Sequence, residues 1–378
     1  MKHPSKTLSL IFCLLASVAH AQDQIIRIGH VGPISGALSN LGKDNENGAK
    51  IAIEEINGAN LTLNGRPVKF ELILEDDAAS PMVATAAAKR LVEAKVSGVI
   101  GHLNSGASIA ASQIYDQAGI PQISPSSTNP KYTRQGYPGA FRIVANDEQL
   151  GQILGKFAAE KLNAKKIAII DDQTAYGSLL SGAFEKSAKE YGVNIIARRQ
   201  ITENDSDFLS TLTSIKSEQP EIIFLGGMDT TAGPMIRQIN ELGMKVALMG
   251  GDGICSGQLP ILAGNSINAV RVFCAEAGGI EKESEARMLR FRAKFKSRFG
   301  TDVQVYSPYV YDAVYVMVQS MINAQSYDPA KYLPALKAIN FKGITGNVTF
   351  DQNGDNKNGT LTLMTYIEGK RTNIAVIR

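Results

Sequence analysis

Short apolar runs rich in valine and isoleucine alternate with amphipathic stretches of helical length along most of this chain. Apolar runs of about four to eight residues suit buried strands, whereas longer segments with apolar residues at helical spacing suit helices. Their alternation is typical of a doubly wound α/β fold with a mostly parallel sheet. It starts at Ile25–Val31 and, after a first crossing near 141–147, restarts at Lys166–Asp171. We therefore predict two α/β lobes.

The expected elements follow from where each apolar run begins and ends. In the first lobe we expect strands at 25–31, 69–74, 98–101 and 120–123, and helices at 45–56, 82–93 and 108–118. In the second we expect strands at 166–171, 193–198, 222–225 and 246–249, and helices at 176–191, 208–218 and 230–242. Beyond these we expect helices at 281–299, 307–324 and 329–338, and a β-hairpin that pairs 346–350 with 360–368.

The first 21 residues have the features of a secretory signal. Lys2 and Lys6 precede an apolar run from Leu8 to Ala19, and the segment ends in Ala19-His20-Ala21. We expect cleavage after Ala21 and a periplasmic mature protein. No second apolar segment of about 18 residues follows, so we expect no membrane insertion of the mature chain.

Charge and cysteine content constrain the partners and the compartment. The formal charge of +3 falls to +1 without the signal, which carries two lysines. Nucleic-acid-binding proteins have basic patches, so we expect no nucleic-acid partner. Cys255 and Cys274 remain as an even pair in an oxidising compartment. We expect a disulfide between them, with two buried free thiols as the alternative.

Two corners rich in hydroxyl groups follow successive strands of the first lobe. Ser105–Ser108 open the helix after the strand ending at Ile100, and Ser124–Asn129 follow the next strand. Helix N-termini at the carboxyl ends of parallel strands bind anions through free N–H groups. Because neither corner has the lysine of a phosphate-binding loop, they suit a carboxylate better than a triphosphate. The alternative for the first corner is ordinary N-capping by Ser105 or Ser108.

The second lobe offers an aromatic residue and an acid at its own corners. Tyr176 follows the strand 166–171, and Asp252 lies in the glycine-rich corner after the strand 246–249. A carboxylate at this position would neutralise a ligand ammonium. The alternatives are core packing for Tyr176 and a solvated turn for Asp252.

Catalytic and metal-binding motifs are scarce. Asp351-x-Asn353-x-Asp355 begins like a calcium loop, but Asn356 replaces the glycine of its sharp turn, so we interpret the segment as a hairpin turn. The chain has neither a G-x-S-x-G nor an H-E-x-x-H motif. His30 and His102 lie in or beside strands, where a structural role is expected. We therefore expect no cofactor, no metal and no enzymatic activity.

Several short motifs follow one another along the chain: Ile28-Gly29-His30-Val31-Gly32-Pro33-Ile34-Ser35-Gly36, Glu75-Asp76-Asp77, Val99-Ile100-Gly101-His102, Ile123-Ser124-Pro125-Ser126-Ser127-Thr128, Tyr176-Gly177, Phe224-Leu225-Gly226-Gly227 and Gly250-Gly251-Asp252-Gly253. Their order and spacing resemble those of the periplasmic leucine/isoleucine/valine-binding proteins, the substrate-binding components of branched-chain amino-acid ABC transporters. The resemblance implies a type I periplasmic-binding fold, in which two lobes joined by three crossovers close on a ligand. It implies one lobe of residues 22–146 plus 276–351 and another of 147–275 plus 352–378.

The resemblance also implies the roles of individual residues. Ser105 and Thr128 match positions that bind the amino-acid carboxylate. The backbone carbonyl of Ser126, the Thr128 hydroxyl and Asp252 match positions that meet the ammonium, and Tyr176 matches an aromatic residue that covers the ligand. The expected contact set is Ser105, Gly106, Ser126, Ser127, Thr128, Tyr176, Met228 and Asp252, with Leu41 and Leu103 in the pocket wall.

Three departures from the family pattern affect the ligand pocket. Asp252 replaces glutamate, Met228 replaces tyrosine, and Leu41 occupies an aromatic position. A disulfide of some members is absent, since Ala79 and Asn104 stand at its positions. The implied function is capture of a branched-chain or aliphatic amino acid by a monomeric receptor that delivers it to a membrane permease. The alternatives are a receptor of the same fold for an aromatic acid, an amide or another amino acid, and a secreted α/β enzyme.

Overall fold

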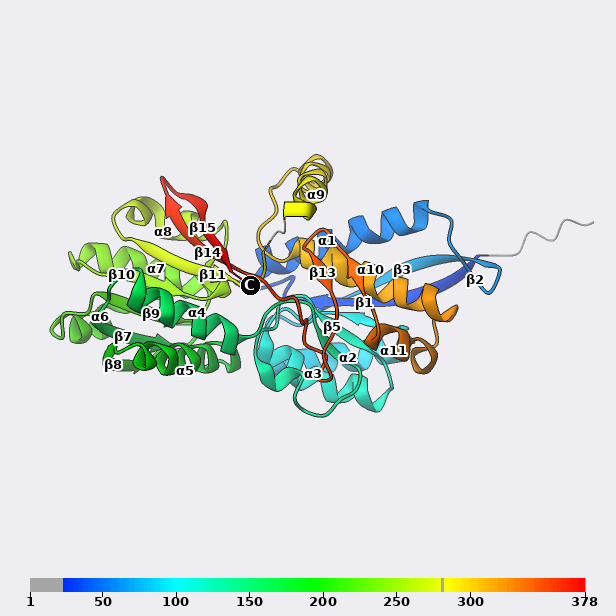
Figure 1. Ribbon diagram of the computed structural model, residues 1–378, viewed down its shortest axis with the longest axis horizontal. Helices are drawn as coiled ribbons and strands as arrows, with labels where there is room; N and C mark the ends of the chain where they lie inside the picture. Colours follow the sequence, from blue (N-terminus) through cyan, green and yellow to red (C-terminus); the bar gives the residue numbers. More distant parts are fainter. Residues whose placement is uncertain (1–22, 280–281, 378) are drawn as a thin grey trace, which may run out of the picture.

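A computed structural model describes residues 23–279 and 282–377. Its two lobes lie side by side along the longest axis of the molecule, each built on one sheet covered by helices (Figure 1). This confirms the predicted fold class. The expected signal, residues 1–21, lies outside the described residues.

The first lobe contains a six-stranded sheet in the order β2-β3-β1-β4-β5-β6. The strands are β1 (Gln24–Gly32), β2 (Thr62–Leu63), β3 (Arg66–Asp76), β4 (Val99–Ile100), β5 (Gln122–Ser124) and β6 (Ala140–Arg142). Along this order, the strands β3, β1, β4, β5 and β6 pair in parallel with their neighbours, and β2 pairs with β3 in antiparallel fashion. The carboxyl ends of β4, β5 and β6 therefore meet at one edge, where the two hydroxyl-rich corners lie.

Helices cover both faces of this sheet. They are α1 (Ser39–Gly58), α2 (Pro81–Glu93), α3 (Ser105–Gln117), the short η1 (Pro130–Tyr132), η4 (Lys282–Ser284), α9 (Glu285–Phe299), α10 (Ser307–Ala324) and α11 (Pro329–Lys337). α2 packs on α3, whereas α10 packs on α1, α11 and the strands β4 and β5. The late helices α9 to α11 thus join the lobe formed by the start of the chain (Figure 1).

The second lobe contains a seven-stranded sheet in the order β15-β14-β11-β10-β9-β7-β8. Its strands are β7 (Lys166–Asp171), β8 (Asn194–Gln200), β9 (Ile222–Gly226), β10 (Ala247–Gly250), β11 (Val272–Glu276), β14 (Leu361–Ile367) and β15 (Lys370–Ile377). Its helices are α4 (Asp147–Glu160), α5 (Ala175–Glu190), α6 (Leu209–Lys216), α7 (Asp229–Glu241), η2 (Asp252–Ile254), α8 (Leu259–Ala263) and η3 (Gly264–Asn268). β7 to β11 pair in parallel.

The apolar run of β7 shows why these strands lack a polar face. Ile167 and Ile169 join one apolar core, and Ala168 and Ile170 join another on the opposite side of the sheet. Since successive side chains of a strand point to opposite faces, a strand covered by helices on both sides must be apolar throughout. A stack of Phe184 on Phe224, with ring centroids 3.8 Å apart, anchors α5 to this sheet.

The predicted hairpin between 346–350 and 360–368 is wrong. β13 (Asn347–Val348) pairs instead with β12 (Phe341–Lys342), and β14 pairs with both β11 and β15. β14 and β15 are joined through Glu368 and Gly369, both with positive φ, as in the tight turns that match strand twist. The segment 351–355 is nevertheless the turn of a short local hairpin, as expected: Phe350 bridges Asn356 in antiparallel fashion, and the Asp351 N–H donates to the Asp355 carbonyl at 2.9 Å. The exact lobe boundaries at residues 146, 275 and 351 stay a prediction.

The expected disulfide between Cys255 and Cys274 is confirmed. The two Cα atoms lie 5.6 Å apart and both residues are fully buried. Among the described residues, no helix combines the length and the apolar character that a membrane span requires.

Candidate functional site

A small cavity of about 20 Å³ lies between the two lobes. Its lining residues are Leu103, Asn104, Ser105, Ser126, Tyr176, Met228, Asp252 and Tyr306. Six of the residues expected at the ligand or in the pocket wall are among them, because the carboxyl ends of both sheets face the same space. Gly106, Ser127, Thr128 and Leu41 are not in this lining.

The first corner presents a free helix N-terminus to the cavity. α3 begins at Ser105, three residues before the expected start, and its N-cap Asn104 makes no side-chain capping bond. The Ser108 hydroxyl instead donates to the carbonyl of His102 and lies 2.6 Å from the hydroxyl of Ser127. N-capping by Ser105 or Ser108, the alternative interpretation, is therefore wrong. The first amides of α3 have no partner within the helix and remain available to an anion.

Hydroxyl groups of the second corner hold the two corners together. Ser126 Oγ donates to the carbonyl of Leu103 at 3.0 Å, and Ser127 Oγ donates to the same carbonyl at 3.1 Å. Ser105 Oγ accepts the backbone N–H of Asn129 at 3.3 Å. The side chain of Ser127 thus helps to hold the two corners together beneath the cavity. The side chain of the next residue, Thr128, makes no such bond.

Thr128 is buried, and its hydroxyl makes no hydrogen bond of good geometry within the described part of the chain. A buried hydroxyl without a partner is costly, so such groups in native proteins call for an explanation. The backbone on both sides of Thr128 is held in place: its own carbonyl accepts the N–H of Asp147 at 2.9 Å. The Thr128 hydroxyl is therefore an unpartnered, buried hydrogen-bonding group on a backbone that is held in place, one residue after Ser127.

Two expected residues lie outside the cavity for clear steric reasons. Gly106 is in the first turn of α3, where an added Cβ would lie 3.2 Å from Pro81 and 3.9 Å from Ala175 at the start of α5. A side chain here would crowd Pro81 of the same lobe, whereas the distance to Ala175 is an ordinary van der Waals contact. Leu41 is buried in α1 and belongs to the large apolar core. Leu103 and Met228 supply the apolar part of the cavity wall.

Asp252 is the centre of a hydrogen-bonded group at the second lobe. Its side chain is buried, with 2 % of the residue exposed, and accepts hydrogen bonds from Tyr176 at 2.8 Å and Tyr306 at 3.0 Å. Burial raises the pKa of the Asp252 carboxyl to about 6, and the two tyrosine hydroxyls counter part of this rise. Asp252 is therefore no solvated turn residue, and Tyr176 faces the cavity rather than serving only as core packing.

Tyr306 was not found by sequence reasoning. It lies immediately before α10 in the first lobe, so its bond to Asp252 joins the two lobes. A second link runs from the side-chain amide of Asn129 to the carbonyl of Ala175. No local pattern around Tyr306 distinguishes it from the other tyrosines of α10.

Asp147 is another residue that the sequence did not reveal, as is Asn104 in the cavity lining. It is fully buried at the start of α4, and burial followed by the nearby charge of Asp252 raises the pKa of its carboxyl well above the ordinary range. The Thr128 hydroxyl lies close enough to counter this rise in part, but the two groups are not aligned as a hydrogen bond. Asp147 and Asp252 thus bring two buried carboxyl groups to one side of the site.

The two histidines have the expected structural positions. Both are buried; His102 Nδ1 lies 2.7 Å from Asp77 and its Nε2 lies 3.1 Å from the Tyr115 hydroxyl. Burial lowers the pKa of His30 to about 4, so its imidazole is neutral at physiological pH. Among the residues described by the structure, no cluster of three or more His, Cys, Asp or Glu side chains could hold a metal ion.

Two larger hollows lie elsewhere. One of about 740 Å³ runs between α4 and β15, and another of about 830 Å³ lies at the edge of the first sheet near β2 and α11. We place the functional site at the smaller cavity, because buried unpartnered polar groups and carboxyl groups with shifted pKa values gather there.

Comparisons with known proteins place the chain among similar sequences and structures. A protein-family model described as "Periplasmic binding protein" matches residues 25–371. An "Amino acid binding protein" of Pseudomonas aeruginosa is 33% identical over 341 residues, covering 89% of each chain. A "Leucine-, isoleucine-, valine-, threonine-, and alanine-binding protein" of the same organism is 30% identical over 367 residues, covering 96% of each chain. The branched-chain amino acid transporter substrate binding protein of Streptococcus pneumoniae, solved with isoleucine, has a TM-score of 0.83 and 27% identity, covering 94% of this chain and 99% of its own.

Proposed function

Because the chain belongs to the periplasmic binding protein family, we propose that it captures an aliphatic amino acid between its lobes and delivers it to the permease of an ABC transporter. The family and the similar structures consist of substrate-binding proteins rather than enzymes. The receptor function follows from the family; the ligand and the residues that hold it are the proposal.

The observation that carries the proposal is the placement of opposite polar groups around one cavity. The free amides of α3 and the hydroxyls of Ser105 and Thr128 lie on the first lobe, and suit a carboxylate. Asp252 lies across the cavity, with Asp147 near it, and no lysine or arginine is among the eight lining residues. This arrangement complements a zwitterion, whose ammonium and carboxylate are adjacent. Leu103 and Met228 leave an apolar wall for its side chain.

The two lobes contact each other across the site, through Tyr306 and Asp252 and through Asn129 and Ala175. A cavity of about 20 Å³ has room for about one water molecule, far less than an amino acid needs. Entry of the ligand therefore requires the lobes to separate, which breaks the bond between Tyr306 and Asp252. Hinge rotation about the crossings between the lobes is the motion that such folds use.

A specific observation favours a second ligand class, small hydroxylated amino acids. Asn104 lines the cavity, and its Oδ1 is buried without a hydrogen-bond partner in the described residues. This oxygen would accept a hydrogen bond from a ligand hydroxyl. A relative from Pseudomonas aeruginosa carries threonine in its name beside the branched-chain amino acids.

Calorimetric titration of refolded, ligand-stripped protein tests the ligand directly. The panel contains leucine, isoleucine, valine, alanine, threonine, phenylalanine, glutamate and benzoate. Micromolar or tighter binding of the aliphatic group supports the main proposal, and a preference for threonine supports the second. Binding of benzoate alone would overturn both, since benzoate has no ammonium for Asp252.

Replacing Thr128 by valine is expected to weaken amino-acid binding about tenfold, roughly 1.4 kcal/mol, because one hydrogen bond to a charged ligand is lost. Valine has the same shape, so the surrounding loop should keep its packing. The measurement is the Kd from titration of both proteins. Ser112→Ala is the control: this serine is buried in α3 but bonds only to Ile109 and Gln135. An unchanged Kd in Thr128→Val would contradict the site.

Binding is expected to weaken below pH 6. Burial between the lobes raises the pKa of the Asp252 carboxyl to about 6, and a ligand ammonium beside it would lower that pKa, so the complex holds fewer protons. As the pH falls from 6 to 4.5, the Kd should rise by up to about tenfold for each pH unit. Above pH 6 the Kd should level off. Titration over this range measures it. Asp252→Asn should flatten this part of the profile, and an equal slope in that variant would assign the effect to another group, such as Asp147.

We also propose that the mature protein is a periplasmic monomer that begins at Gln22. Intact mass and N-terminal sequencing of the exported protein test the cleavage site, and a start other than Gln22 would correct it. Co-purification with the permease subunits of an ABC transporter would test the transport role.

A further inference from the structure

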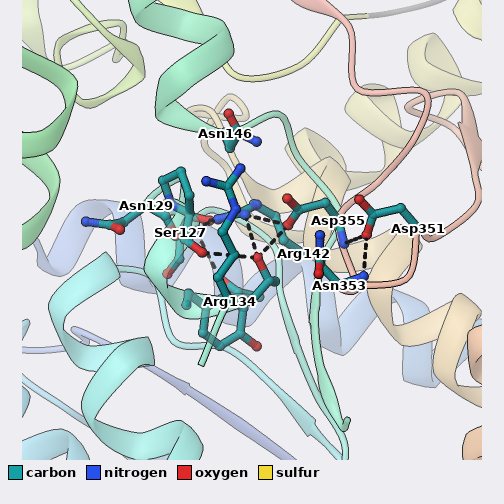
Figure 2. A network of polar contacts seen from close by, with 12 residues as sticks. Ser127, Asn129, Arg134, Arg142, Asn146, Asp351, Asn353 and Asp355 are labelled. Carbon is teal, nitrogen blue, oxygen red and sulfur yellow. Dashed lines mark hydrogen bonds and ion pairs between the residues drawn. The ribbon is translucent and has the colours of Figure 1, made fainter. Parts of the chain in front are cut away.

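Arg142, at the end of β6, has a fully buried guanidinium that joins parts of the chain far apart in sequence. Its Nη1 donates to the carbonyls of Ser127 at 3.1 Å and Asn129 at 2.8 Å. Its Nη2 donates to Thr133 Oγ1 at 2.9 Å and to Asp355 Oδ1 at 2.5 Å. Figure 2 shows these contacts converging on the guanidinium from both sides.

Asp355 belongs to a turn in the segment that crosses between the lobes. Asp351 Oδ1 accepts the N–H groups of Asn353 and Asp355, which fixes the turn internally (Figure 2). The carbonyl of Gly354 accepts the backbone N–H of Arg142 at 2.9 Å. The turn is thus bound to β6 through both the backbone and the ion pair.

The two carbonyls that Arg142 holds flank Thr128. Together with the bond from the Asp147 N–H to the Thr128 carbonyl, they fix the peptide groups before and after this residue. We propose that Arg142 is a positioning residue that couples the crossing segment at Asp351–Asp355 to the orientation of the Thr128 hydroxyl. This inference rests on the proposed function only in assigning Thr128 to the ligand.

The chemistry of the guanidinium supports positioning over simple stabilisation. A buried ion pair is weak evidence for stability, because desolvation offsets most of its attraction. Only one of the four bonds of Arg142 goes to a carboxylate, and two go to the backbone around Thr128. The planar fork of arginine can reach these separate acceptors at once, whereas the ammonium of lysine is a point charge.

The first test uses hydrogen exchange of the ligand-free protein, so it does not depend on the ligand. The N–H groups of Ser127 and Asn129 donate to Ser124 Oγ and Ser105 Oγ, and their exchange reports on the loop. Arg142→Met should speed their exchange at least tenfold. Asp355→Asn, a milder variant, should speed the exchange of these N–H groups by a smaller factor. Arg142→Lys should leave their exchange faster than in the wild-type protein.

Arg371→Met is the matched control for the exchange experiment. Arg371 also has an acid partner, Glu276 at 2.6 Å, and donates to the carbonyl of Cys255, but it does not contact the loop around Thr128. In the Arg371→Met variant, the N–H groups of Ser127 and Asn129 should exchange at the wild-type rate, under conditions in which both variants are folded. Equal loosening in the Arg371 variant, unchanged exchange in the Arg142 variant, or full protection in Arg142→Lys would overturn the positioning role.

The second test is a double-mutant cycle in amino-acid binding. Arg142→Met should raise the Kd at least tenfold in the wild-type background but less than threefold in the Thr128→Val background, because its effect acts through Thr128. Additive effects would overturn the coupling to the ligand. If the wild-type protein binds no amino acid, the proposed function fails, while the exchange experiment still decides whether Arg142 fixes the loop.

Discussion

Replacing Asp252 by asparagine is expected to raise the Kd for the preferred amino acid about a hundredfold, roughly 2.7 kcal/mol. The side chain is buried and its carboxylate is the acid that lines the cavity. Asparagine has nearly the same shape and can still accept a bond from Tyr176 or Tyr306. The variant therefore removes the negative charge and leaves a buried ligand ammonium without its counter-ion, which costs about 2–5 kcal/mol for buried charged pairs.

Asp229→Asn is the matched control for this substitution. Asp229 is also a buried acid of the second lobe with a raised pKa, but its partner is Ser256 and it does not line the cavity. The Kd of the Asp229→Asn variant should stay within about threefold of the wild-type value, because a substitution away from the ligand leaves the binding contacts intact. A Kd that changes equally in both variants would mean that Asp252 acts through the fold of the lobe, and would remove it from the ligand site.

The order of most strands and helices could be predicted because each of them has its own local signal, but β6, α4 and β11 were not among the expected elements. β7 and α10 have the predicted bounds, and most others differ by a few residues at their ends. Covering both faces of a sheet requires strands that are apolar throughout, and that pattern is visible without knowing the partners. The same topology explains why the hydroxyl corners were found: residues just after parallel strands must gather at one edge.

Residues that depend on contacts between the lobes could not be predicted in this way. Tyr306 reaches Asp252 across 54 positions of sequence, and Asp147 and Asp252 approach each other from different elements of the second lobe. Tyr306 and Asp147 have no motif around them, because their roles are set by contacts with elements far away in the sequence. Arg142 is similar, since its partner Asp355 lies 213 positions away. The false hairpin has the same cause: β14 pairs with β11, nearly ninety positions earlier in the chain, and a local pattern cannot show this choice.

The Cys255–Cys274 disulfide is expected to contribute about 3 kcal/mol to the free energy of unfolding, because it closes a loop of about 20 residues in the unfolded chain. It also ties the corner that carries Asp252 to β11: Cys255 donates its N–H to the Asp252 carbonyl, and Cys274 pairs with Gly250 of β10. Urea unfolding of the oxidised and the reduced protein measures the difference. Reduction keeps both side chains, so no cavity is introduced.

The double variant Cys255→Ala/Cys274→Ala is the control for effects of the reductant. Its stability should be equal with and without reductant, and close to that of the reduced wild-type protein apart from the loss of two buried sulfur atoms. A difference of less than about 1 kcal/mol between oxidised and reduced wild type would contradict the loop-closure estimate. Because both sulfurs are fully buried, the native bond should resist reduction until the lobe unfolds, so the reduced sample must be prepared from the denatured protein. Slow reduction under native conditions and a large loss of stability are therefore expected together, as both follow from a bond enclosed in the core beside the Asp252 corner.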